Sequence, residues 1–359
     1  MHFEAAPFYF PINKLYNSNC MLYNGNILAD KENLMIKVSV NALSHLCRSY
    51  GINEEDLSFL GGGREDSDGI AYVYYNKGQK KVFKILAADK PGTDDLAALD
   101  ERLKFIHYLG ESGIDIAGPE ENRDHRLYDT YTDEKHVFIA YSMNYCEGES
   151  PGTELLATDL SWHWGKLIGK AHRVARSYPV WKNISGKPSE FGYEDEIHFF
   201  TNWCKEESVK EEWRKMALTL SKLPIDRNTY GFIHNDNHQH NIIVKDKHIT
   251  LIDFDVSGCN FFLQDITVPA QGIMFDLSGG MVNEVYQKEP LKYYFDYFIN
   301  GYETESHLED FWLEQIDTFI QYRRLLLFTC MQDYLNYNTE LKKSFLSTIK
   351  AGPEIFRLL

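Results

Sequence analysis

The chain has 359 residues, of which 43% are hydrophobic, so it can bury a large core and is not disordered as a whole. Its 37 basic and 53 acidic residues give a net charge of −16, which argues against nucleic acid as a partner because phosphate contacts need a basic surface. No run approaches the roughly 18 apolar residues that a membrane-spanning helix needs.

The elements predicted for the first part of the chain form a small α+β lobe. Residues 1–36 show little periodicity and are interpreted as an N-terminal extension. Within residues 37–145, the stretch 57–75 predicts two strands around a glycine-rich turn, and 80–86 and 136–143 predict further strands. Leucine and isoleucine recur at spacings of three and four over 94–109, which indicates an amphipathic helix.

The second part of the chain, residues 146–359, predicts a mostly helical lobe. Apolar side chains follow a helical period over 159–178, and further helices are expected near 193–222, 290–301 and 308–336. Strand-like patterns are found there only around residues 240–254.

The segment 231–243, GFIHNDNHQHNII, carries the densest chemistry and allows more than one interpretation. His234, Asp236, His238 and His240 fall at every second position, so on a strand they would share one face and could bind zinc, as in a zinc-dependent hydrolase. Such a site needs further ligands, and downstream only His248 and His307 are available, without a motif around either. A polar loop with incidental histidines is another alternative.

The third interpretation uses the residues between the histidines. His234-x-Asp236-x-x-x-x-Asn241 is followed by a strand-like segment that contains Asp253. Phosphoryl transfer from ATP needs a carboxylate that orients the acceptor hydroxyl and accepts its proton, and oxygen ligands for Mg²⁺. This spacing matches the kinase pattern, with Asp236 as the base and with Asn241 and Asp253 as the Mg²⁺ ligands.

The segment resembles the aminoglycoside phosphotransferase and choline kinase superfamily, whose signature is HGDxxxxN followed by IDF[DE]. WGKLIGKAH (164–172), NFFLQDI (260–266) and FINGYETE (298–305) are similar to three further stretches of that family, so the resemblance covers roughly residues 55 to 330. It implies an α+β, bilobal, protein-kinase-like fold, with ATP in the cleft between the lobes. The sequence departs from the family at Asn235, where glycine is usual.

A phosphate loop and a phosphate-binding lysine are expected in the small lobe. The glycine run that contains Gly62 and Gly63 lies between two predicted strands, where backbone N–H groups can face phosphate, and Ser67 lies at the expected loop tip. Lys84 alternates with apolar residues on its strand, so it should point into the lobe, whereas Lys80 and Lys81 are expected to be solvated.

An acidic partner for Lys84 and an adenine-binding segment complete the expected nucleotide site. The family places a glutamate just before an L-x-F/W pattern, and strict alignment puts Arg102 there, so we take its neighbour Glu101 as the partner. Met143 and Tyr145 follow a predicted strand and should form the segment that joins the lobes and binds adenine, mainly through backbone groups.

The acceptor is expected to be a small molecule. Asp255 replaces the glycine of the D-F-G motif and no A-P-E motif follows, so a segment that holds a peptide is lacking. Asp265 and the acidic run at 302–310 could attract an amine-bearing acceptor, although a solvated acidic face is the alternative. A catalytically silent, nucleotide-binding scaffold is a further alternative to an enzyme.

Two properties concern the whole protein. The six cysteines are scattered without a CxxC pair and no signal peptide is evident, which is typical of a cytoplasmic protein with reduced thiols. The sequence does not indicate the oligomeric state.

Overall fold

The structure is a computed structural model, which describes residues 38–62, 69–88, 93–134, 136–152, 158–178, 192–277 and 288–353. The predicted N-terminal extension, residues 1–36, lies outside the described residues. The chain divides into two compact units. Unit 1 comprises the described residues up to Gly110 together with Ala117–Cys146, and unit 2 comprises Glu111–Ile116 and the described residues from Glu147 onward.

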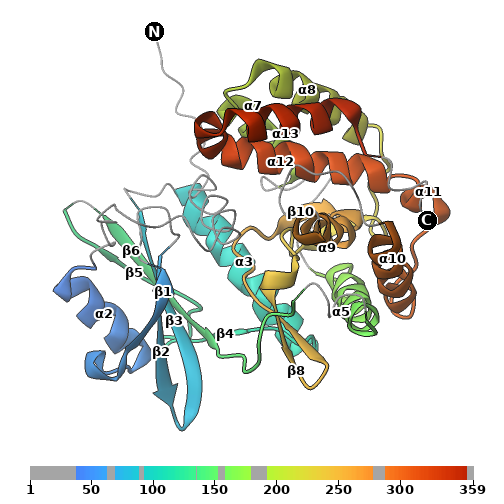
Figure 1. Cartoon of the computed structure of the whole chain (residues 1–359). Coiled ribbons are helices and arrows are strands. Elements are labelled where there is room, and N and C mark those ends of the chain that lie inside the picture. Colours follow the sequence, from blue (N-terminus) through green and yellow to red (C-terminus); the bar gives the residue numbers. More distant parts are fainter. Residues whose placement is uncertain are drawn as a thin grey trace. The chain divides into compact units, whose positions relative to one another are not determined.

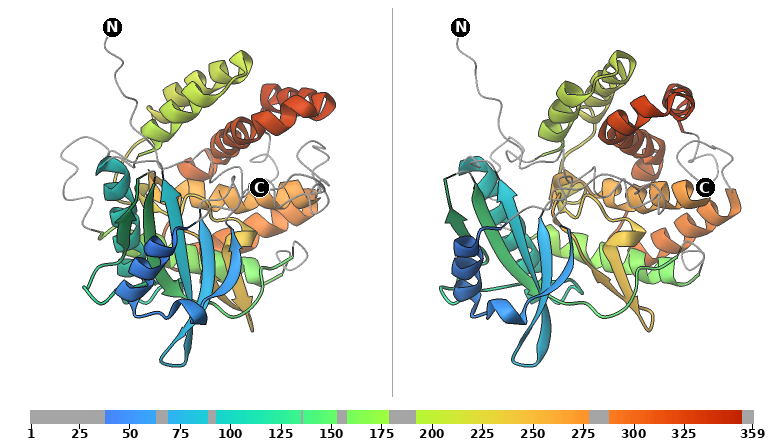
Figure 2. Two further views of the ribbon diagram at one scale, coloured as in Figure 1. Left: turned by 90° about the vertical axis from the view of Figure 1, so that its left-hand side faces the viewer. Right: turned by 60° about the vertical axis from the view of Figure 1, so that its left-hand side comes forward.

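Unit 1 contains a six-stranded sheet, which twists as Figure 2 shows. Its strands are β1 (Ser58–Gly62), β2 (Ile70–Asn76), β3 (Gln79–Ala88), β4 (Pro119–Glu120), β5 (Asp129–Thr132) and β6 (Val137–Asn144). The strand order is β1-β2-β3-β6-β4, and β5 also pairs with β6. The strands predicted at 57–75, 80–86 and 136–143 are confirmed as β1 with β2, β3 and β6.

Helix α2 (Val40–Tyr50) packs on one face of this sheet (Figure 1), and the sequence did not predict it. Ser39 caps its start by accepting a hydrogen bond from the N–H of Ala42 at 3.3 Å, and Gly51 ends it with φ 71°. Its buried side chains pack against Phe83 and Ile85 of β3. Eleven residues give too short a periodic pattern to stand out in a stretch rich in strand signals.

One predicted helix and a short turn complete unit 1. Helix α3 (Thr93–Glu111) confirms the helix predicted at 94–109, and a 3₁₀ turn, η1 (Glu54–Asp56), precedes β1. Lys77 and Gly78 both have positive φ, as the two-residue turn between β2 and β3 requires.

Unit 2 is mainly helical. Its helices are α5 (Leu160–Ala175), α7 (Tyr193–Trp203), α8 (Glu207–Leu220), α9 (Phe262–Leu277), α10 (Lys288–Tyr302), α11 (Asp310–Leu313), α12 (Ile316–Tyr337) and α13 (Thr339–Ala351). The helical region predicted near 193–222 consists of α7 and α8, and α13 follows α12 directly, as Figures 1 and 2 show. Across the described ranges, every helix falls short of the combination of length and apolarity that a bilayer crossing demands.

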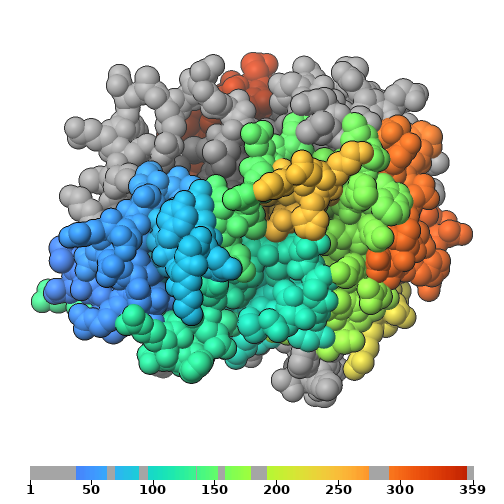
Figure 3. Space-filling view, turned by 90° about the horizontal axis from the view of Figure 1, so that it is seen from below, coloured from blue at the N-terminus to red at the C-terminus, as the bar shows by residue number. Residues whose placement is uncertain are grey.

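Unit 2 also contains two pairs of short antiparallel strands. These are β7 (Tyr230–Ile233) with β10 (Gly258–Phe261), and β8 (Ile242–Lys245) with β9 (His248–Leu251). The prediction that strands occur only around 240–254 was wrong, because it missed β7 and β10. Both have four residues, all of them buried, so no alternation of polar and apolar residues marks them. The exposed turn of the β8–β9 hairpin is seen in gold in Figure 3.

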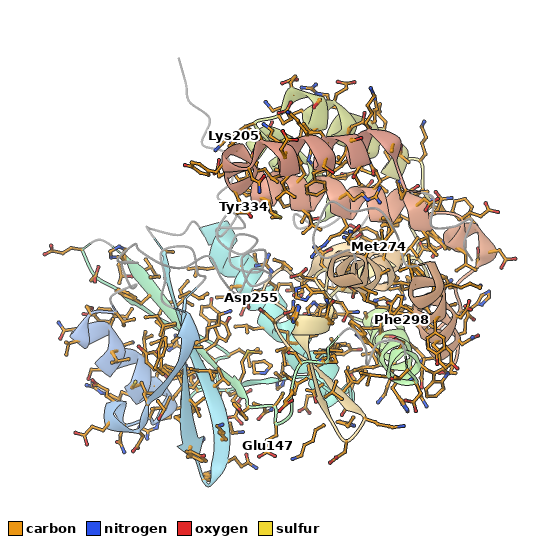
Figure 4. The ribbon with its side chains drawn as sticks, in the orientation of Figure 1. Glu147, Lys205, Asp255, Met274, Phe298 and Tyr334 are labelled. Atoms are coloured by element: carbon orange, nitrogen blue, oxygen red, sulfur yellow. The ribbon has the colours of Figure 1, made fainter. Side chains whose placement is uncertain are left out.

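Helices α5 and α10 approach each other closely at glycine residues. A Cβ atom on Gly165 would lie 1.9 Å from the carbonyl oxygen of Phe298, and one on Gly301 would lie 2.0 Å from that of Trp162. Phe298, labelled in Figure 4, also packs its ring against Trp164, with centroids 5.8 Å apart. These contacts fix α5, which brings His172 to the loop after β7.

Candidate active site

The loop after β7 is held by one carboxylate from α9. Asp265 accepts the N–H of His234 at 2.9 Å and the N–H of Asn235 at 2.7 Å, one with each oxygen. His172 of α5 donates from Nε2 to Asp265 at 3.3 Å, and its Nδ1 lies 3.0 Å from the hydroxyl of Tyr302. All these side chains are buried. Because Asp265 binds the main chain, it sets the path of the loop irrespective of the side chains at 234 and 235.

Asn237 adds a second attachment between this loop and the helices. Its Nδ2 donates to the carbonyl oxygen of Asp265 at 3.1 Å, and its Oδ1 accepts from Nε1 of Trp164 at 2.9 Å. The side chain is completely buried, and its donor and acceptor are both used. Asp236, the predicted base, therefore lies between two residues that are tied to α9.

Asp236 is 2% exposed and is surrounded by donors. Nη2 of Arg323, on α12, donates to Oδ1. Nε2 of His238 lies 3.5 Å from Oδ2, and Nδ2 of Asn241 donates to Oδ2 at 3.3 Å. Burial alone would raise the pKa of Asp236, but the charge of Arg323, together with His238 and His234, holds that pKa well below its ordinary value. The carboxylate is therefore ionised throughout the neutral pH range.

The two predicted metal ligands lie at the open end of the β8–β9 hairpin. The strands pair as far as that end, where the N–H of Ile252 donates to the carbonyl oxygen of Asn241 at 3.0 Å, and Asp253 is the next residue. Within the described structure, the Asn241 amide makes its hydrogen bonds through Nδ2, both to Asp236, so Oδ1 remains for another ligand. Asp253 is half-buried with φ 60°, an uncommon angle for a residue other than glycine.

The histidines of the segment have roles within the loop. Nε2 of His234 donates to the carbonyl oxygen of Ile252 at 2.8 Å, and its ring lies 4.3 Å from that of Phe254. Nδ1 of His238 accepts the N–H of His240 at 3.1 Å, and His240 is exposed. Among the residues that the structure describes, no group of three or more His, Cys, Asp or Glu side chains could share a metal ion. These contacts therefore favour a catalytic loop over a zinc cage.

In unit 1, the structure corrects the prediction for Lys81. Lys84 is half-buried, with Nζ 6.0 Å from the ring centroid of Tyr141 on the neighbouring strand. Lys81 was expected to be solvated, but it is 4% exposed, contacts the Glu120 carboxylate and donates to Oδ1 of Asn144 at 2.8 Å. The alternation of β3 places Lys81 on the face that α2 covers, and its partners lie far away in the sequence.

Glu101, the predicted partner of Lys84, lies half-buried on α3. The preceding residue, Asp100, pairs with Lys104 one turn further along the helix. The pairing of Glu101 with Lys84 stays a prediction.

The predicted phosphate loop is only partly within the described residues. Gly62 ends β1 with φ 79°, and a Cβ atom there would lie 2.1 Å from the carbonyl oxygen of Gly69. The close approach of β1 and β2 thus requires glycine at this position by itself. Gly63 and Ser67 lie outside the described residues.

The predicted adenine-binding segment is the last part of unit 1. Met143 lies in β6, which pairs with β3 on one side and with β4 on the other. The N–H of Tyr145 donates to the carbonyl oxygen of Lys80 at 3.4 Å, and Nζ of Lys80 lies 3.6 Å from the centroid of the Tyr145 ring. Lys80 is therefore packed on an aromatic ring and is half-buried, where the sequence predicted a solvated lysine.

These features agree with a comparison to protein families. The model of the phosphotransferase enzyme family matches residues 67–298, a range that contains the loop, the hairpin and α9. The chain belongs to this family. Its members are enzymes, so the chain is a phosphotransferase, as the sequence predicted.

Known kinases of small molecules are similar to this phosphotransferase along most of its length. Amicoumacin kinase from Bacillus subtilis (strain 168) is 22% identical over 309 residues, which cover 83% of this chain and 86% of that protein. The structure of an amicoumacin kinase in complex with AMP-PNP, Ca²⁺ and Ami has a TM-score of 0.73 at 21% identity, and covers 86% of this chain and 92% of that one. A microcompartment-associated aminopropanol kinase has a TM-score of 0.61 at 14% identity, with coverage of 87% and 97%. These similarities confirm the predicted fold.

Two charged residues near Asp236, Arg323 and Glu196, lie outside the family motifs that were recognised in the sequence. Arg323 lies 87 positions from Asp236 in the sequence. Glu196 binds Asn235, which is 39 positions away from it. A signal for Arg323 was present in QYRRLLLF, where two arginines directly precede a run of four apolar residues. Buried charges need partners, so such an arginine indicates an internal carboxylate.

Proposed function

We propose that this phosphotransferase moves the γ-phosphate of ATP to a hydroxyl group of a small, amine-bearing molecule, with Asp236 as the base. The observation that carries the proposal is the state of Asp236. Its carboxylate is buried and paired with Arg323, and the loop that presents it is attached to α9 on both sides. A carboxylate so fixed can hold a hydroxyl group in one orientation.

The low pKa of Asp236 determines how it would act. A weakly basic carboxylate does not remove a hydroxyl proton before the reaction, but it accepts a hydrogen bond and orients the oxygen toward phosphorus. In the loose transition state of phosphoryl transfer, the hydroxyl becomes acidic only as its bond to phosphorus forms. Asp236 then takes the proton late, while Arg323 balances its negative charge until that point.

Asn241 and Asp253 would hold Mg²⁺. An amide oxygen and a carboxylate are hard oxygen ligands, which suit this cation, and Oδ1 of Asn241 is available for it. When bound, Mg²⁺ bridges the phosphates and neutralises their charge. Through Nδ2, Asn241 also steadies Asp236, so the same side chain would connect the metal site to the base.

In unit 1, Lys84 would contact the phosphates and Glu101 would fix its ammonium group. Lys84 is half-buried on the central part of the sheet, where a lysine side chain is restrained. The other proposed nucleotide-binding residues are Gly62, Gly63 and Ser67 for phosphate, and Met143 and Tyr145 for adenine. The similar amicoumacin kinase structure is a complex with AMP-PNP and Ca²⁺, which supports the use of a nucleotide and a divalent cation.

The proposal that the acceptor is a small, amine-bearing molecule is supported by the similar kinases. The aminopropanol kinase acts, by its name, on a small molecule with an amino and a hydroxyl group. The acidic run at 302–310 gives little support, because Glu303 binds the N–H of Leu308 and Glu305 pairs with Arg173. Asp265 is likewise engaged by the loop. A cytoplasmic location remains part of the proposal, and the five cysteines described in the structure are free thiols.

A screen of small hydroxyl compounds, read out as ADP release, tests this function. We expect turnover with an amine-bearing acceptor, and we expect Asp236→Ala to lower kcat by roughly 10²- to 10⁴-fold because the orienting carboxylate is lost. Asp333→Ala, at an exposed ion pair with Lys205, serves as the control and should keep full activity. Full activity of Asp236→Ala would exclude this residue as the base, and nucleotide binding without turnover on any acceptor would favour the silent scaffold.

Metal titration gives a second test. We expect Asp253→Asn and Asn241→Ala each to weaken Mg²⁺ binding by at least about tenfold, because each removes one of two protein ligands. Binding is measured by calorimetry with the non-hydrolysable nucleotide present, and Asp159→Asn, an exposed residue paired with Lys247, is the control. Stoichiometric zinc in the purified protein would contradict the proposal and support a zinc-dependent hydrolase.

A further inference from the structure

Asn235, which occupies the position where the resembling family has glycine, is bonded through both ends of its amide. Nδ2 donates to Oε2 of Glu196 at 2.7 Å and to the carbonyl oxygen of Val256 at 3.3 Å. Oδ1 accepts from Nδ2 of Asn260 at 3.1 Å. The residue is 4% exposed and has φ 68°, which asparagine tolerates better than most residues. Its side chain therefore connects the catalytic loop to α7.

Glu196 has two donors, one for each carboxylate oxygen. Asn235 binds Oε2, and the hydroxyl of Tyr322 donates to Oε1. Its helix, α7, begins beside a bridge between Gly192 and Cys259 of β10, so the position of Glu196 is tied to the strand next to the loop. Burial raises the pKa of Glu196, although its two donors and the nearby Arg323 oppose this effect.

Arg323 interacts with two carboxyl groups. It follows Tyr322 on α12 and binds Asp236, and its charge also acts on Glu196. Asp236 in turn disfavours a negative charge on Glu196. One guanidinium group is thus near two buried carboxyl groups, and its Nη2 donates to Asp236. Buried carboxylate oxygens need hydrogen-bond donors. Which carboxylate Arg323 contacts therefore depends on whether the oxygens of Glu196 already have other donors.

We propose that Asn235 and Tyr322 occupy the oxygens of Glu196 and thereby keep Arg323 on Asp236. Asn235 is in this view a positioning residue for phosphoryl transfer, and the proposal rests on the proposed role of Asp236. If either donor is removed, Glu196 takes the guanidinium as its new donor, and Asp236 loses the partner that balances its charge and fixes its orientation.

The central variant is Asn235→Gly, which keeps a residue that accepts φ 68° and removes only the side chain. We expect kcat to fall by roughly 10- to 100-fold, because the carboxylate is misplaced, while KM for the nucleotide stays within about twofold. Adding Glu196→Gln should restore most of the lost kcat, because glutamine does not compete for the guanidinium as a charged group.

Tyr322→Phe gives a second, independent test of the proposal, because it removes the other donor to Glu196 and keeps the aromatic ring. We expect a fall in kcat of the same direction, again reversed by Glu196→Gln. Tyr230→Phe is the matched control: its buried hydroxyl donates to the backbone carbonyl of Cys259 at 2.9 Å, so it reports the cost of losing a buried phenol without touching Glu196. Equal activity of Asn235→Gly and its double variant would overturn the proposal.

A crystal structure of Asn235→Gly separates this proposal from the proposed function, because it needs no acceptor. We expect the Arg323 guanidinium to bind Glu196 in this variant and to return to Asp236 when Glu196→Gln is added. If Arg323 remains on Asp236 in Asn235→Gly, the positioning role is wrong, whatever the enzyme phosphorylates. If the wild type phosphorylates no acceptor while the guanidinium moves as expected, the proposed function fails and the structural coupling stands.

Discussion

Replacing Arg323 with methionine is expected to lower the free energy of unfolding by roughly 3–5 kcal/mol, because Asp236 would remain as a buried charge without its partner. The side chains are 6% and 3% exposed, so water cannot replace the guanidinium. Methionine fills a similar volume, which limits the effect to the charge and the hydrogen bond. Urea unfolding at neutral pH measures the change, and acceptor-dependent turnover should fall as well.

The control for this prediction is Arg173→Met, the same substitution at an exposed ion pair. Arg173 lies 2.9 Å from Glu305 and its side chain is 50% exposed, so we expect a loss below about 1 kcal/mol. If both substitutions had equally small effects on stability, the pair between Arg323 and Asp236 would not be the buried contact described above.

Gly165→Ala is expected to destabilise the protein by about 3 kcal/mol, the upper end of the usual cost of overpacking. The new methyl group would lie 1.9 Å from a carbonyl oxygen of α10, and a backbone atom cannot turn aside as a side chain can. Helices α5 and α10 would have to separate along their contact. Gly301→Ala should have a similar effect, since its methyl group would meet the backbone of α5 at 2.0 Å. Thermal and urea unfolding both measure the change.

Gly118→Ala provides the comparison. A Cβ atom there would have its nearest neighbour, Nδ2 of Asn144, at 3.7 Å, which is an ordinary contact. We expect a change within about 0.5 kcal/mol in either direction. A similar result for Gly165→Ala would mean that the two helices are packed less tightly than the structure indicates.

The parts of the candidate site that the sequence predicted are contiguous or follow a simple period. Asp236 and Asn241 are five positions apart in one loop, and Asp253 follows through a single hairpin, so the chain itself carries them to one place. The fold could be inferred for the same reason, because strand alternation and helical period are local properties. The strands β7 and β10 were not predicted, because four buried residues in a row show no alternation of polar and apolar side chains.

The parts that could not be predicted depend on contacts between distant segments. Arg323 reaches Asp236 from α12, and Lys81 finds Glu120 across 39 positions. Glu196 binds Tyr322 across 126 positions. No spacing rule links such pairs, since each depends on how whole elements pack. A buried lysine and a solvated lysine also look the same within one strand, until the partners that β4 and β6 supply are known.

The two hydrogen bonds that Asp265 accepts from the catalytic loop matter for directed evolution of this enzyme. Because Asp265 holds two consecutive main-chain N–H groups, the loop should keep its path when the side chain at 235 changes. The backbone angle restricts a library at that position to residues that accept positive φ, chiefly glycine, asparagine and aspartate. Diversifying positions 235 and 196 together would therefore alter the surroundings of the base while its scaffold stays in place.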